Sequence, residues 1–571
     1  METSPISLKE MPSGMDSFKE IIEGDYLYVD KTRHIFDLVR KGKNYFLSRP
    51  KRFGKSLLLS ALKSFFSGPP DLNGHPAGLF QNLWIAKSGL VFPERHPIIY
   101  LSMASPGKNN DFLETTILDA LNDINFLEDL GLKLTTLGSG FSRVIERLFL
   151  KYKKQVVILI DEYDAPVSEK IDNLPLAELN RDTLKDFYSG LKAVGDYTRF
   201  AFITGSTRYA FMGLSAGLNH LVDLTLIERH ADICGFTHGE LDTYFSPYFP
   251  GILEIMKKRG VLTQKSTVMD LRAKILNLYD GYTWDGDTKI LNPYSLLNFI
   301  ENAAFNPYWM QIGASNKFLN SVVSRNPLSF LKDKLQNLTP IDVGYAEVGS
   351  LAPAPALFQT GYLTIDSITF TDKSNLYKFK TPNEEIRTAF EKSFKDSLFG
   401  LLRKDPDGEG IKFKEILDSG DEAKLTALIT SLYSSLPAKL HRAEESFYHS
   451  VLHAYCWGIL DIPPLSELPG GEGTPDIIIL FGDGLYVVIE LKYQKPTDPL
   501  NPETDEEKLK DILGDLASKG LKAIDAKKYA NPYLSRANKI IKIGLGVYHR
   551  EDCLALVKIE DYKGHRAADP Q

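Results

Sequence analysis

Apolar runs with the length of β-strands alternate with helical stretches through the first half of the chain, and this alternation limits the fold more than any other feature. The apolar runs cover residues 44–48, 97–103, 155–164, 199–206 and 221–226. The stretches between them, such as 55–66 and 139–152, have the periodicity of amphipathic helices. Continuously apolar strands separated by helices are typical of a parallel sheet that is covered on both faces. The sequence therefore predicts an α/β fold built on a parallel sheet.

The sequence RPKRFGKS, which begins at Arg49, ends like a phosphate-binding loop but lacks the first glycine of such a loop. In the general pattern G-x-x-x-x-G-K-[ST], backbone N–H groups surround the phosphates, the lysine reaches the outer phosphates and the hydroxyl holds Mg²⁺. Arg49 takes the place of the first glycine, and Pro50 could supply rigidity there instead. Gly54 would let the backbone approach the phosphates, Lys55 would contact them and Ser56 would hold Mg²⁺. Because a helical stretch follows the loop, the helix N-terminus can face an anion.

The loop lies in a strongly basic part of the chain. Between residues 31 and 63 there are ten Lys or Arg residues and a single acidic residue. The side chains of Arg49, Lys51 and Arg52 could place charge on the phosphates in place of the missing glycine, or they could face outward toward nucleic acid. A solvated basic face is the simpler alternative. Together with Phe53, these residues complete the predicted nucleotide-binding segment.

Two further apolar strands end in polar residues that suit a nucleotide site. In VVILIDEYD, Asp161 could position Mg²⁺ through water, and Glu162 could polarise a water molecule toward the γ-phosphate. In RFAFITGSTR, Thr204 or Ser206 could sense the γ-phosphate, and Arg208 could stabilise its charge. The carboxyl ends of parallel strands meet at the edge of the sheet where ligands bind in open α/β folds. A simple turn after the strand, and an arginine supplied by another protomer, remain open alternatives.

The sequence pattern changes twice along the chain, which indicates several domains. At 571 residues the chain is too long for one core, and a prior of about 150 residues per domain indicates three or four. We predict a phosphate-loop core over residues 1–235, then a helical lid with a small mixed, winged-helix-like module over 236–395. A third α/β domain is predicted over 396–571, where two strand-like runs at 474–493 flank a Gly-Asp-Gly turn.

Several segments of the chain resemble a known family. They are SFKEIIEGDYLYVDKTRHI, FLSRPKRFGKSLLLS, LIDEYDAPV, FITGSTR, DICGFTHGEL, YDGYTWDG, LNPYSLLNF and LFQTGYLTI. They are similar to AAA-ATPase-like proteins that carry a C-terminal PD-(D/E)XK nuclease domain, and the resemblance covers nearly the whole chain. Members of that family have RP-[KR]-RFGKS in place of the first glycine, so the departure from the general pattern is the family's own form. The resemblance implies an AAA-like ATPase core in 1–235 and a nuclease-like domain in 396–571.

Two acids and a lysine near the predicted hairpin form a second candidate site. Glu490 and Lys492 are two residues apart on a strand and therefore point to the same face, and Asp476 can lie beside them on the neighbouring strand. Two carboxylates suit a hard cation such as Mg²⁺, with Mn²⁺ as a substitute. Such an ion polarises a phosphodiester and lowers the pKa of a bound water molecule. Lys492 could orient that water or stabilise the developing charge.

The resemblance adds one acid to this site and also shows a departure from the family pattern. In family members a Glu on the preceding helix joins the metal site, and Glu445 matches that place, with Glu444 as its nearest competitor. A solvated acidic helix face is the alternative for Glu445. Related nucleases often carry a Gln six residues before a Tyr on the helix after the E-x-K strand, whereas this chain has Ala523 before Tyr529.

Cysteines and histidines exclude some other kinds of site. Cys234, Cys456 and Cys553 lie far apart without a CxxC pair, which excludes a disulfide framework and a Cys-rich zinc site. His449 and His453 are four residues apart on one helical face. Because they lack a third ligand and have apolar neighbours, we interpret them as packing residues rather than as zinc ligands.

The charge and the hydropathy pattern bound the cellular setting. The net charge of −7 does not favour nucleic acid overall, although the phosphate loop is locally basic. The N-terminus lacks the basic and then apolar pattern of a signal sequence, and no apolar run approaches 18 residues. We therefore expect a cytoplasmic protein without a membrane partner.

These observations lead to one functional hypothesis and one alternative. The leading hypothesis is an ATP-binding and ATP-hydrolysing P-loop protein joined to a Mg²⁺-dependent phosphodiesterase that acts on nucleic acid. DNA is the expected nucleic acid on the resemblance alone. The alternative is a nucleotide-dependent regulatory switch whose nuclease-like domain binds nucleic acid or protein without cleavage. A homo-oligomer is compatible with both.

Overall fold

The computed structural model divides the chain into two compact units. The first contains Met1–Arg325 and Lys332–Glu391, and the second contains Asn326–Leu331 and Lys392–Gln571. The structure describes residues 8–68, 78–90, 94–104, 113–170, 173–207, 221–311, 338–339, 353–388, 406–435, 445–460, 464–465, 472–495, 506–549 and 553–562. The first unit holds both the predicted core and the predicted lid, and the division into three domains stays a prediction.

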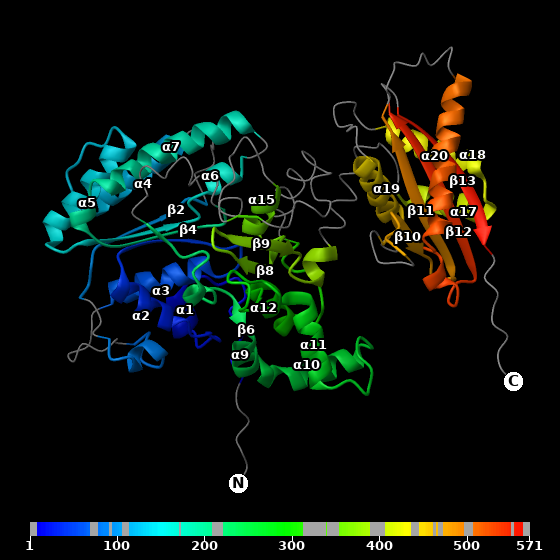
Figure 1. Cartoon of the computed structure of the whole chain (residues 1–571). Helices are drawn as coiled ribbons and strands as arrows, with labels where there is room; N and C mark the ends of the chain where they lie inside the picture. Colours follow the sequence, from blue (N-terminus) through cyan, green and yellow to red (C-terminus); the bar gives the residue numbers. More distant parts are fainter. Residues whose placement is uncertain are drawn as a thin grey trace, which may run out of the picture. The chain divides into compact units, whose positions relative to one another are not determined.

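A five-stranded parallel sheet forms the core of the first unit (Figure 1). Its strands are β1 (Asn44–Ser48), β2 (Ile98–Ser102), β3 (Val156–Asp161), β4 (Thr198–Gly205) and β5 (Val222–Asp223). The spatial order is β2-β3-β4-β1-β5, and every neighbouring pair is parallel. All six residues of β3 are buried, as expected for a strand that is covered on both faces. The predicted α/β fold with a parallel sheet is confirmed.

Helices cover both faces of this sheet (Figure 1). On one side lie α1 (Phe18–Glu23), α2 (Thr32–Lys41) and α3 (Lys55–Ser67). On the other side lie α4 (Leu113–Leu127), α5 (Leu137–Tyr152), α6 (Ala165–Ser168) and α7 (Leu174–Lys192). Short 3₁₀ turns occur at Trp84–Lys87, Gly195–Tyr197 and Glu228–His230. Since β4 lies between β1 and β3, the residues that follow these three strands meet at one edge of the sheet.

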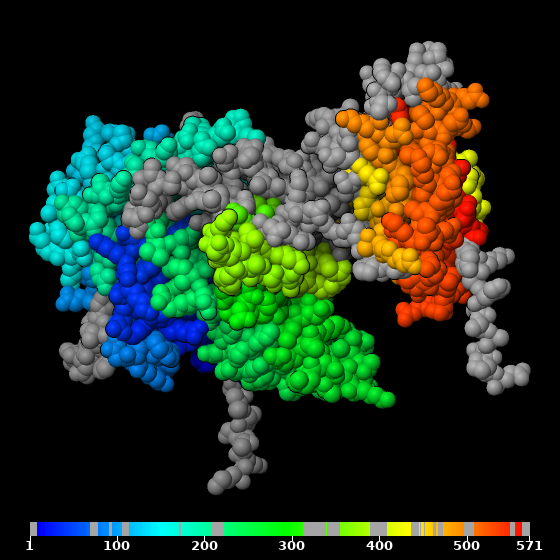
Figure 2. All heavy atoms as spheres, viewed as in Figure 1, coloured from blue at the N-terminus to red at the C-terminus, as the bar shows by residue number. Residues whose placement is uncertain are grey.

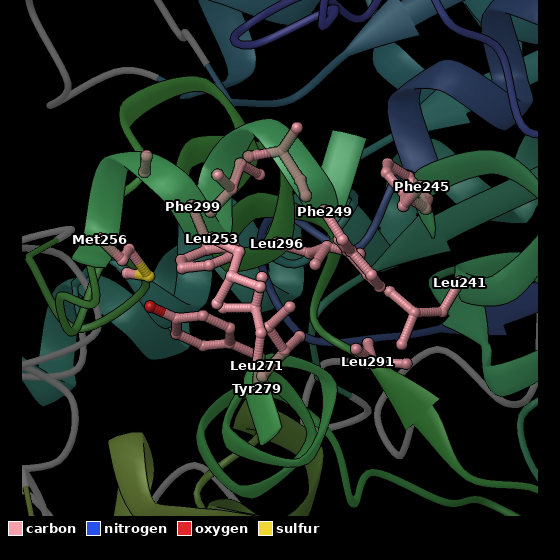
Figure 3. Close-up of a cluster of buried hydrophobic side chains, with 14 of the residues drawn as sticks. Leu241, Phe245, Phe249, Leu253, Met256, Leu271, Tyr279, Leu291, Leu296 and Phe299 are labelled. Carbon is pink, nitrogen blue, oxygen red and sulfur yellow. The ribbon is translucent and has the colours of Figure 1, made fainter. Parts of the chain in front are cut away.

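The remainder of the first unit, residues 236–311 and 353–388, is called the middle module below. Its helical part contains α9 (His238–Glu240), a π-helical turn (Leu241–Phe245), a 3₁₀ turn (Ser246–Tyr248), α10 (Phe249–Lys258), α11 (Val268–Tyr279) and α12 (Pro293–Asn302). Strands β6 (Phe236–Thr237) and β7 (Ile290–Leu291) pair antiparallel. Apolar side chains from α10, α11 and α12 converge in one buried cluster (Figure 3). This cluster holds the helices together by hydrophobic burial.

A small hairpin completes the middle module. Helix α15 (Pro353–Thr360) leads into β8 (Thr364–Phe370), which pairs antiparallel with β9 (Asn375–Lys380). The hairpin lies at the surface and borders the helical part of the module (Figure 2). The main-chain N–H of Thr283 donates to Thr364 Oγ1 over 2.8 Å, which ties the two parts together.

The second unit is a four-stranded mixed sheet with helices. The strands β10 (Ile477–Leu480), β11 (Leu485–Gln494), β12 (Lys539–His549) and β13 (Cys553–Tyr562) follow each other in spatial order. The pairs β10/β11 and β12/β13 are antiparallel, and β11/β12 is parallel. The helices are α17 (Pro406–Ser419), α18 (Glu422–Ser434), α19 (Glu445–Ile459) and α20 (Glu506–Ala526), with a 3₁₀ turn at Asn531–Tyr533. The predicted hairpin is confirmed, and Gly484 in its turn has φ +86°.

Helix α20 packs against β11, β12 and β13, while α18 packs against β13 and α19 against β11. Two glycines of β12, Gly544 and Gly546, allow the backbone of α20 to approach the strand closely. Among the helices that the structure describes, none is both long and apolar enough to cross a bilayer.

Candidate functional site

A cavity of about 430 Å³ opens at the N-terminus of α3. The loop contributes Lys51, Arg52, Phe53, Gly54, Lys55 and Ser56 to its wall, and Glu162 from the end of β3 lies on the same wall. The rest of the wall is mostly apolar and comes from residues 12–35, 57–58, 233–236, 245 and 293–297. A cavity with a cationic, N–H-rich end and a large apolar remainder suits a ligand that combines phosphates with a flat ring system.

The backbone of the loop shows why a glycine is required at one position and not at another. Gly54 has φ +94°, and a Cβ there would meet no atom within 4 Å, so the left-handed conformation rather than space selects glycine. Arg52 is also left-handed, with φ +67°. Arg49 is not among the residues with positive φ. The position where the general pattern has its first glycine therefore has no conformational need for one.

Lys55 is the buried cation of the site, and its side chain is held by the loop itself. The Nζ atom donates to the main-chain oxygens of Arg49 and Pro50 over 2.9 and 3.0 Å. Burial lowers the pKa of Lys55, an effect that the nearby charges of Glu162 and Asp161 oppose. A cation in this position can exchange carbonyl partners for phosphate oxygens, which bind it more strongly because they are charged.

The acids after β3 are brought to the same place. Asp161 Oδ1 accepts hydrogen bonds from Thr204 Oγ1 over 2.6 Å and from the main-chain N–H of Glu162 over 3.0 Å. Glu162 adopts φ +49°, a left-handed conformation that is costly for a residue with a side chain and that clusters at functional sites. Burial raises the pKa of Glu162, and the charges of Lys55 and Lys51 oppose that rise.

The residues that follow β4 have a more structural arrangement. The main-chain N–H of Ser206 donates to Asp164 Oδ1 over 3.0 Å, and its carbonyl oxygen accepts from Ser48 Oγ over 3.0 Å. Asp164 also accepts from the main-chain N–H of Thr207 over 2.7 Å. Thr204 contacts Asp161 rather than the cavity, and Arg208 lies outside the described residues. The predicted γ-phosphate contacts of Thr204 and Ser206 stay predictions.

The structure differs from both expectations for the side chain of Arg49. This side chain is completely buried and does not line the cavity. Its Nη1 atom donates to the carbonyl oxygens of Ser48 and Thr225 over 2.9 and 3.0 Å, and its Nη2 atom donates to that of His230 over 3.2 Å. The guanidinium thus faces the protein interior and neither the phosphates nor the surface. Pro50 is likewise absent from the cavity wall.

The other basic residues of the loop remain at the cavity. Lys51 lines it while its Nζ lies 3.3 Å from Glu169 Oε1, and the Arg52 guanidinium lies 5.6 Å from the ring centroid of Tyr294. Phe53 is buried, with its ring edge-to-face with that of Tyr282.

The residues of the second candidate site lie in the C-terminal unit, at and beside the hairpin of β10 and β11. The register of β10 and β11 pairs Ile477 with Ile489, which brings Asp476 beside Glu490. Asp476 Oδ2 accepts a hydrogen bond from the main-chain N–H of Leu491 over 2.7 Å. Lys492 Nζ lies 3.1 Å from Glu490 Oε1. The two acids and the lysine therefore share one small region.

Helix α19 supplies a third carboxylate to this region. Glu445 Oε1 lies 3.7 Å from Lys492 Nζ, and Glu445 Oε2 accepts from the main-chain N–H of Tyr493 over 3.1 Å. His449, one turn further along α19, has its Nε2 atom 2.8 Å from the carbonyl oxygen of Asp476. Glu444 lies outside the described residues.

Burial makes Glu490 the unusual acid of this site. Its side chain is buried, and Glu490 Oε2 has no hydrogen-bond partner among the described residues. Burial and the nearby charge of Asp476 raise the pKa of Glu490, against the effect of Lys492. Burial lowers the pKa of Lys492, but the charges of Glu490 and Glu445 outweigh that effect and the net shift is upward. A buried, unsatisfied carboxylate oxygen is costly unless something pairs with it.

The chemistry of these donors fits a divalent cation only in part. Carboxylate oxygens such as those of Asp476 and Glu490 are suitable ligands for Mg²⁺ or Mn²⁺, and Glu490 Oε2 is unpaired. In the part of the chain that the structure describes, however, no three His, Cys, Asp or Glu side chains converge closely enough to hold a metal ion. Lys492 is the group that neutralises Glu490 in this structure.

Sequence reasoning missed the part of the cavity wall that lies beyond the phosphate loop. The N-terminal segment contributes Met15, Tyr28 and Lys31, and the segment after β5 contributes Cys234 and Phe236. These segments carry no pattern of their own that indicates a nucleotide. The signal that could have found them is their likeness to family segments, since Tyr28 and Lys31 lie in SFKEIIEGDYLYVDKTRHI and Cys234 and Phe236 lie in DICGFTHGEL.

Two comparisons with known proteins bear on this arrangement. Residues 12–215 match the model of the AAA-ATPase-like family, described as "Predicted AAA-ATPase". The AAA-ATPase-like region thus contains the phosphate loop, the acids after β3 and the whole of β4. A protein of Azotobacter chroococcum mcd 1, described as "Uncharacterized protein in vnfD 5'region", is 27% identical over 554 residues, which are 95% of this chain and 96% of that protein. The similarity therefore extends well beyond the AAA-ATPase-like region and across both compact units.

Proposed function

We propose that the first unit binds and hydrolyses ATP in the cavity at the N-terminus of α3. The observation that carries this proposal is the meeting of Lys55, the N-terminus of α3 and Glu162 on one wall of a cavity whose remainder is mainly apolar. The family match over residues 12–215 supports a nucleotide-binding ATPase. The apolar wall has room for the base and the cationic end for the phosphates.

Each residue of the proposed nucleotide site has a distinct role. The first N–H groups of α3 and the Lys55 ammonium bind the phosphates, while Ser56 and Asp161 would hold Mg²⁺, which neutralises phosphate charge when bound. Glu162 orients and deprotonates the attacking water. Thr204 holds Asp161 in place through the hydrogen bond of 2.6 Å. Burial raises the pKa of Glu162, which makes its carboxylate a stronger base than an exposed one.

Replacement of Lys55 by Ala is expected to weaken ATP binding about 30-fold or more, because removal of a buried charge partner costs about 2 kcal/mol or more. The measurement is a fluorescence titration of the full chain with a fluorescent ATP analogue and Mg²⁺. Lys63→Ala is the matched control, since Lys63 is an exposed lysine of the same helix and does not line the cavity. Wild-type affinity in Lys55→Ala would overturn the nucleotide site.

We further propose that the second unit is a Mg²⁺-dependent phosphodiesterase of the PD-(D/E)XK type that acts on DNA. The proposal is supported by the convergence of Asp476, Glu490 and Lys492, with Glu445 at its edge. The four-stranded sheet with flanking helices is compatible with that fold. ATP binding or hydrolysis would then govern access to this site or its assembly.

In this proposal the protein groups bind the cation and guide a proton. Asp476 and Glu490 would hold Mg²⁺, which polarises the scissile phosphodiester when bound. Lys492 would orient the attacking water, or stabilise the charge that develops on the phosphate. Since Lys492 contacts Glu490 Oε1, the unpaired Glu490 Oε2 is the oxygen that would be left for the cation.

Glu490→Gln is expected to reduce Mg²⁺-dependent DNA cleavage by about 100-fold or more, since it removes a ligand charge from the metal site. Cleavage of single- and double-stranded DNA and RNA by the full chain, with and without a chelator, gives the measurement. Asp483→Asn is the matched control, because Asp483 lies in the turn of the same hairpin and pairs with Lys414. Undiminished cleavage by Glu490→Gln would remove the nuclease assignment.

A second candidate function is a nucleotide-dependent switch whose C-terminal unit binds nucleic acid or protein without cutting. It is favoured by the pairing of Lys492 with Glu490 and Glu445, which supplies part of the positive charge that a metal ion would bring. DNA binding by wild-type protein without chelator-sensitive cleavage would select this function over the nuclease.

A further inference from the structure

The five residues that distinguish this phosphate loop all contact the middle module. In loop order, the contacts are Arg49 with Trp284, Pro50 with Gly361, Lys51 with Trp309, Arg52 with Tyr294, and Phe53 with Tyr282 and Trp284. The loop is therefore supported along its length by residues that are far away in sequence. This pattern suggests that the module does more than cover the cavity.

Arg49 has the strongest of these attachments. Its Cζ atom lies 4.1 Å from the ring centroid of Trp284, which is itself buried. Its guanidinium also donates to main-chain carbonyl oxygens of residues 48, 225, 230 and 231, which lie outside the module, so a fork of several N–H donors is needed and an ammonium could not replace it. A cation over an aromatic face gains strength when water is excluded.

The neighbouring loop residues are held as specifically. The indole N–H of Trp309 donates to the carbonyl oxygen of Lys51 over 2.9 Å. Gly361 has φ +92°, and a Cβ at that position would lie 2.8 Å from Pro50 Cβ, so only glycine allows this approach. The ring of Phe53 meets that of Trp284 edge-to-face at 5.6 Å between centroids.

These attachments involve the residues that hold the loop lysine. Lys55 Nζ donates to the carbonyl oxygens of Arg49 and Pro50, the two residues that contact Trp284 and Gly361. We propose that the middle module shapes the phosphate loop, with Arg49 as a positioning residue that takes over the role of the missing glycine. This inference rests on the proposed ATP site. Because the two effects are thermodynamically linked, ATP binding stabilises the contacts between the module and the loop by the same free energy.

The proposal predicts a result that the general phosphate-loop motif does not predict. Arg49→Gly restores the general pattern G-x-x-x-x-G-K-S, yet it removes the contact between the Arg49 guanidinium and Trp284. ATP affinity should therefore fall about tenfold, the size expected from loss of one desolvated cation–aromatic contact. Trp284→Leu, which changes a side chain outside the cavity wall, should have a similar effect. Trp284→Phe retains an aromatic face and should stay within about threefold of wild type.

The experiment titrates full-length variants with a fluorescent ATP analogue and takes the dissociation constant of the binding-competent fraction from the curve. A role in stability alone would lower that fraction and leave the dissociation constant unchanged. Phe299→Leu is the control for such a role, since Phe299 is buried in the core of the same module and does not line the cavity (Figure 3). The double variant Arg49→Gly/Trp284→Leu should lose less affinity than the two single losses added together, because both single changes remove the Arg49–Trp284 contact.

The outcomes separate this inference from the proposed function. Wild-type affinity in Lys55→Ala refutes the ATP site and the inference with it. Loss of binding in Lys55→Ala, together with wild-type dissociation constants in Arg49→Gly and Trp284→Leu, leaves the ATP site intact and overturns the inference. Additive losses in the double variant also overturn it, because the two residues would then act independently.

Discussion

Replacement of Glu162 by Gln is expected to slow ATP hydrolysis by about 10²–10⁴-fold, the range that a positioned general base contributes. Glutamine has the same size and can still hydrogen-bond to water, but it cannot accept the proton. ATP affinity should change little, because the phosphates are held mainly by Lys55 and the N-terminus of α3. The measurements are steady-state phosphate release and the titration described for Lys55.

The control for this prediction is Glu169→Gln. Glu169 pairs with Lys51 but does not line the cavity, so its loss should leave hydrolysis near the wild-type rate. Because burial raises the pKa of Glu162, the wild-type rate should fall on the acid side at a pH above that of an ordinary carboxyl group. Hydrolysis at the wild-type rate in Glu162→Gln would assign the base to another residue.

Gly544→Ala is expected to destabilise the C-terminal unit by about 3 kcal/mol, because overpacking against backbone atoms cannot be relieved by a rotamer change. A Cβ at Gly544 would lie 2.0 Å from the carbonyl oxygen of Ala517 and 2.8 Å from the main-chain N of Leu521, both on α20. The helix must move off the strand that lies beside the Asp476 and Glu490 region. The transition of this unit in a thermal unfolding scan should fall by about 10 °C.

The same substitution at Gly514 provides a matched comparison. Gly514 is also on α20, but a Cβ there would meet nothing within 4 Å. Alanine is a better helix former than glycine by up to about 1 kcal/mol, so Gly514→Ala should keep or raise the transition temperature. Equal behaviour of the two variants would mean that α20 does not rest on β12 through Gly544.

Local sequence patterns predicted the strands and helices well where apolar residues recur with a clear period. The apolar runs at 44–48 and 155–164 correspond to β1 and β3, and the helical stretch at 55–66 corresponds to α3. The Gly-Asp-Gly turn predicted the β10/β11 hairpin because a positive φ is required at Gly484. The hairpin also explains why the sequence alone could predict that Asp476 and Glu490, though separated along the chain, lie side by side.

Contacts between distant segments could not be predicted in the same way. Trp309 lies 258 residues from Lys51 in the sequence, and nothing near either residue indicates that one supports the other. The spatial order of the strands, with β4 between β1 and β3, likewise depends on how the helices cross over. The part of the cavity wall that comes from the N-terminal segment could not be predicted for the same reason.

By itself, the sequence determined the strands, the helices, the hairpin and the two groups of candidate site residues, because hydrophobic period, turn chemistry and motif spacing are local properties. Only the tertiary structure decided what Arg49 does. The sequence suggested that the charge of Arg49 faces either phosphates or nucleic acid. In the structure its side chain is buried against Trp284 and donates hydrogen bonds to carbonyl oxygens. A buried guanidinium needs partners from several segments, and only the folded chain brings those segments together.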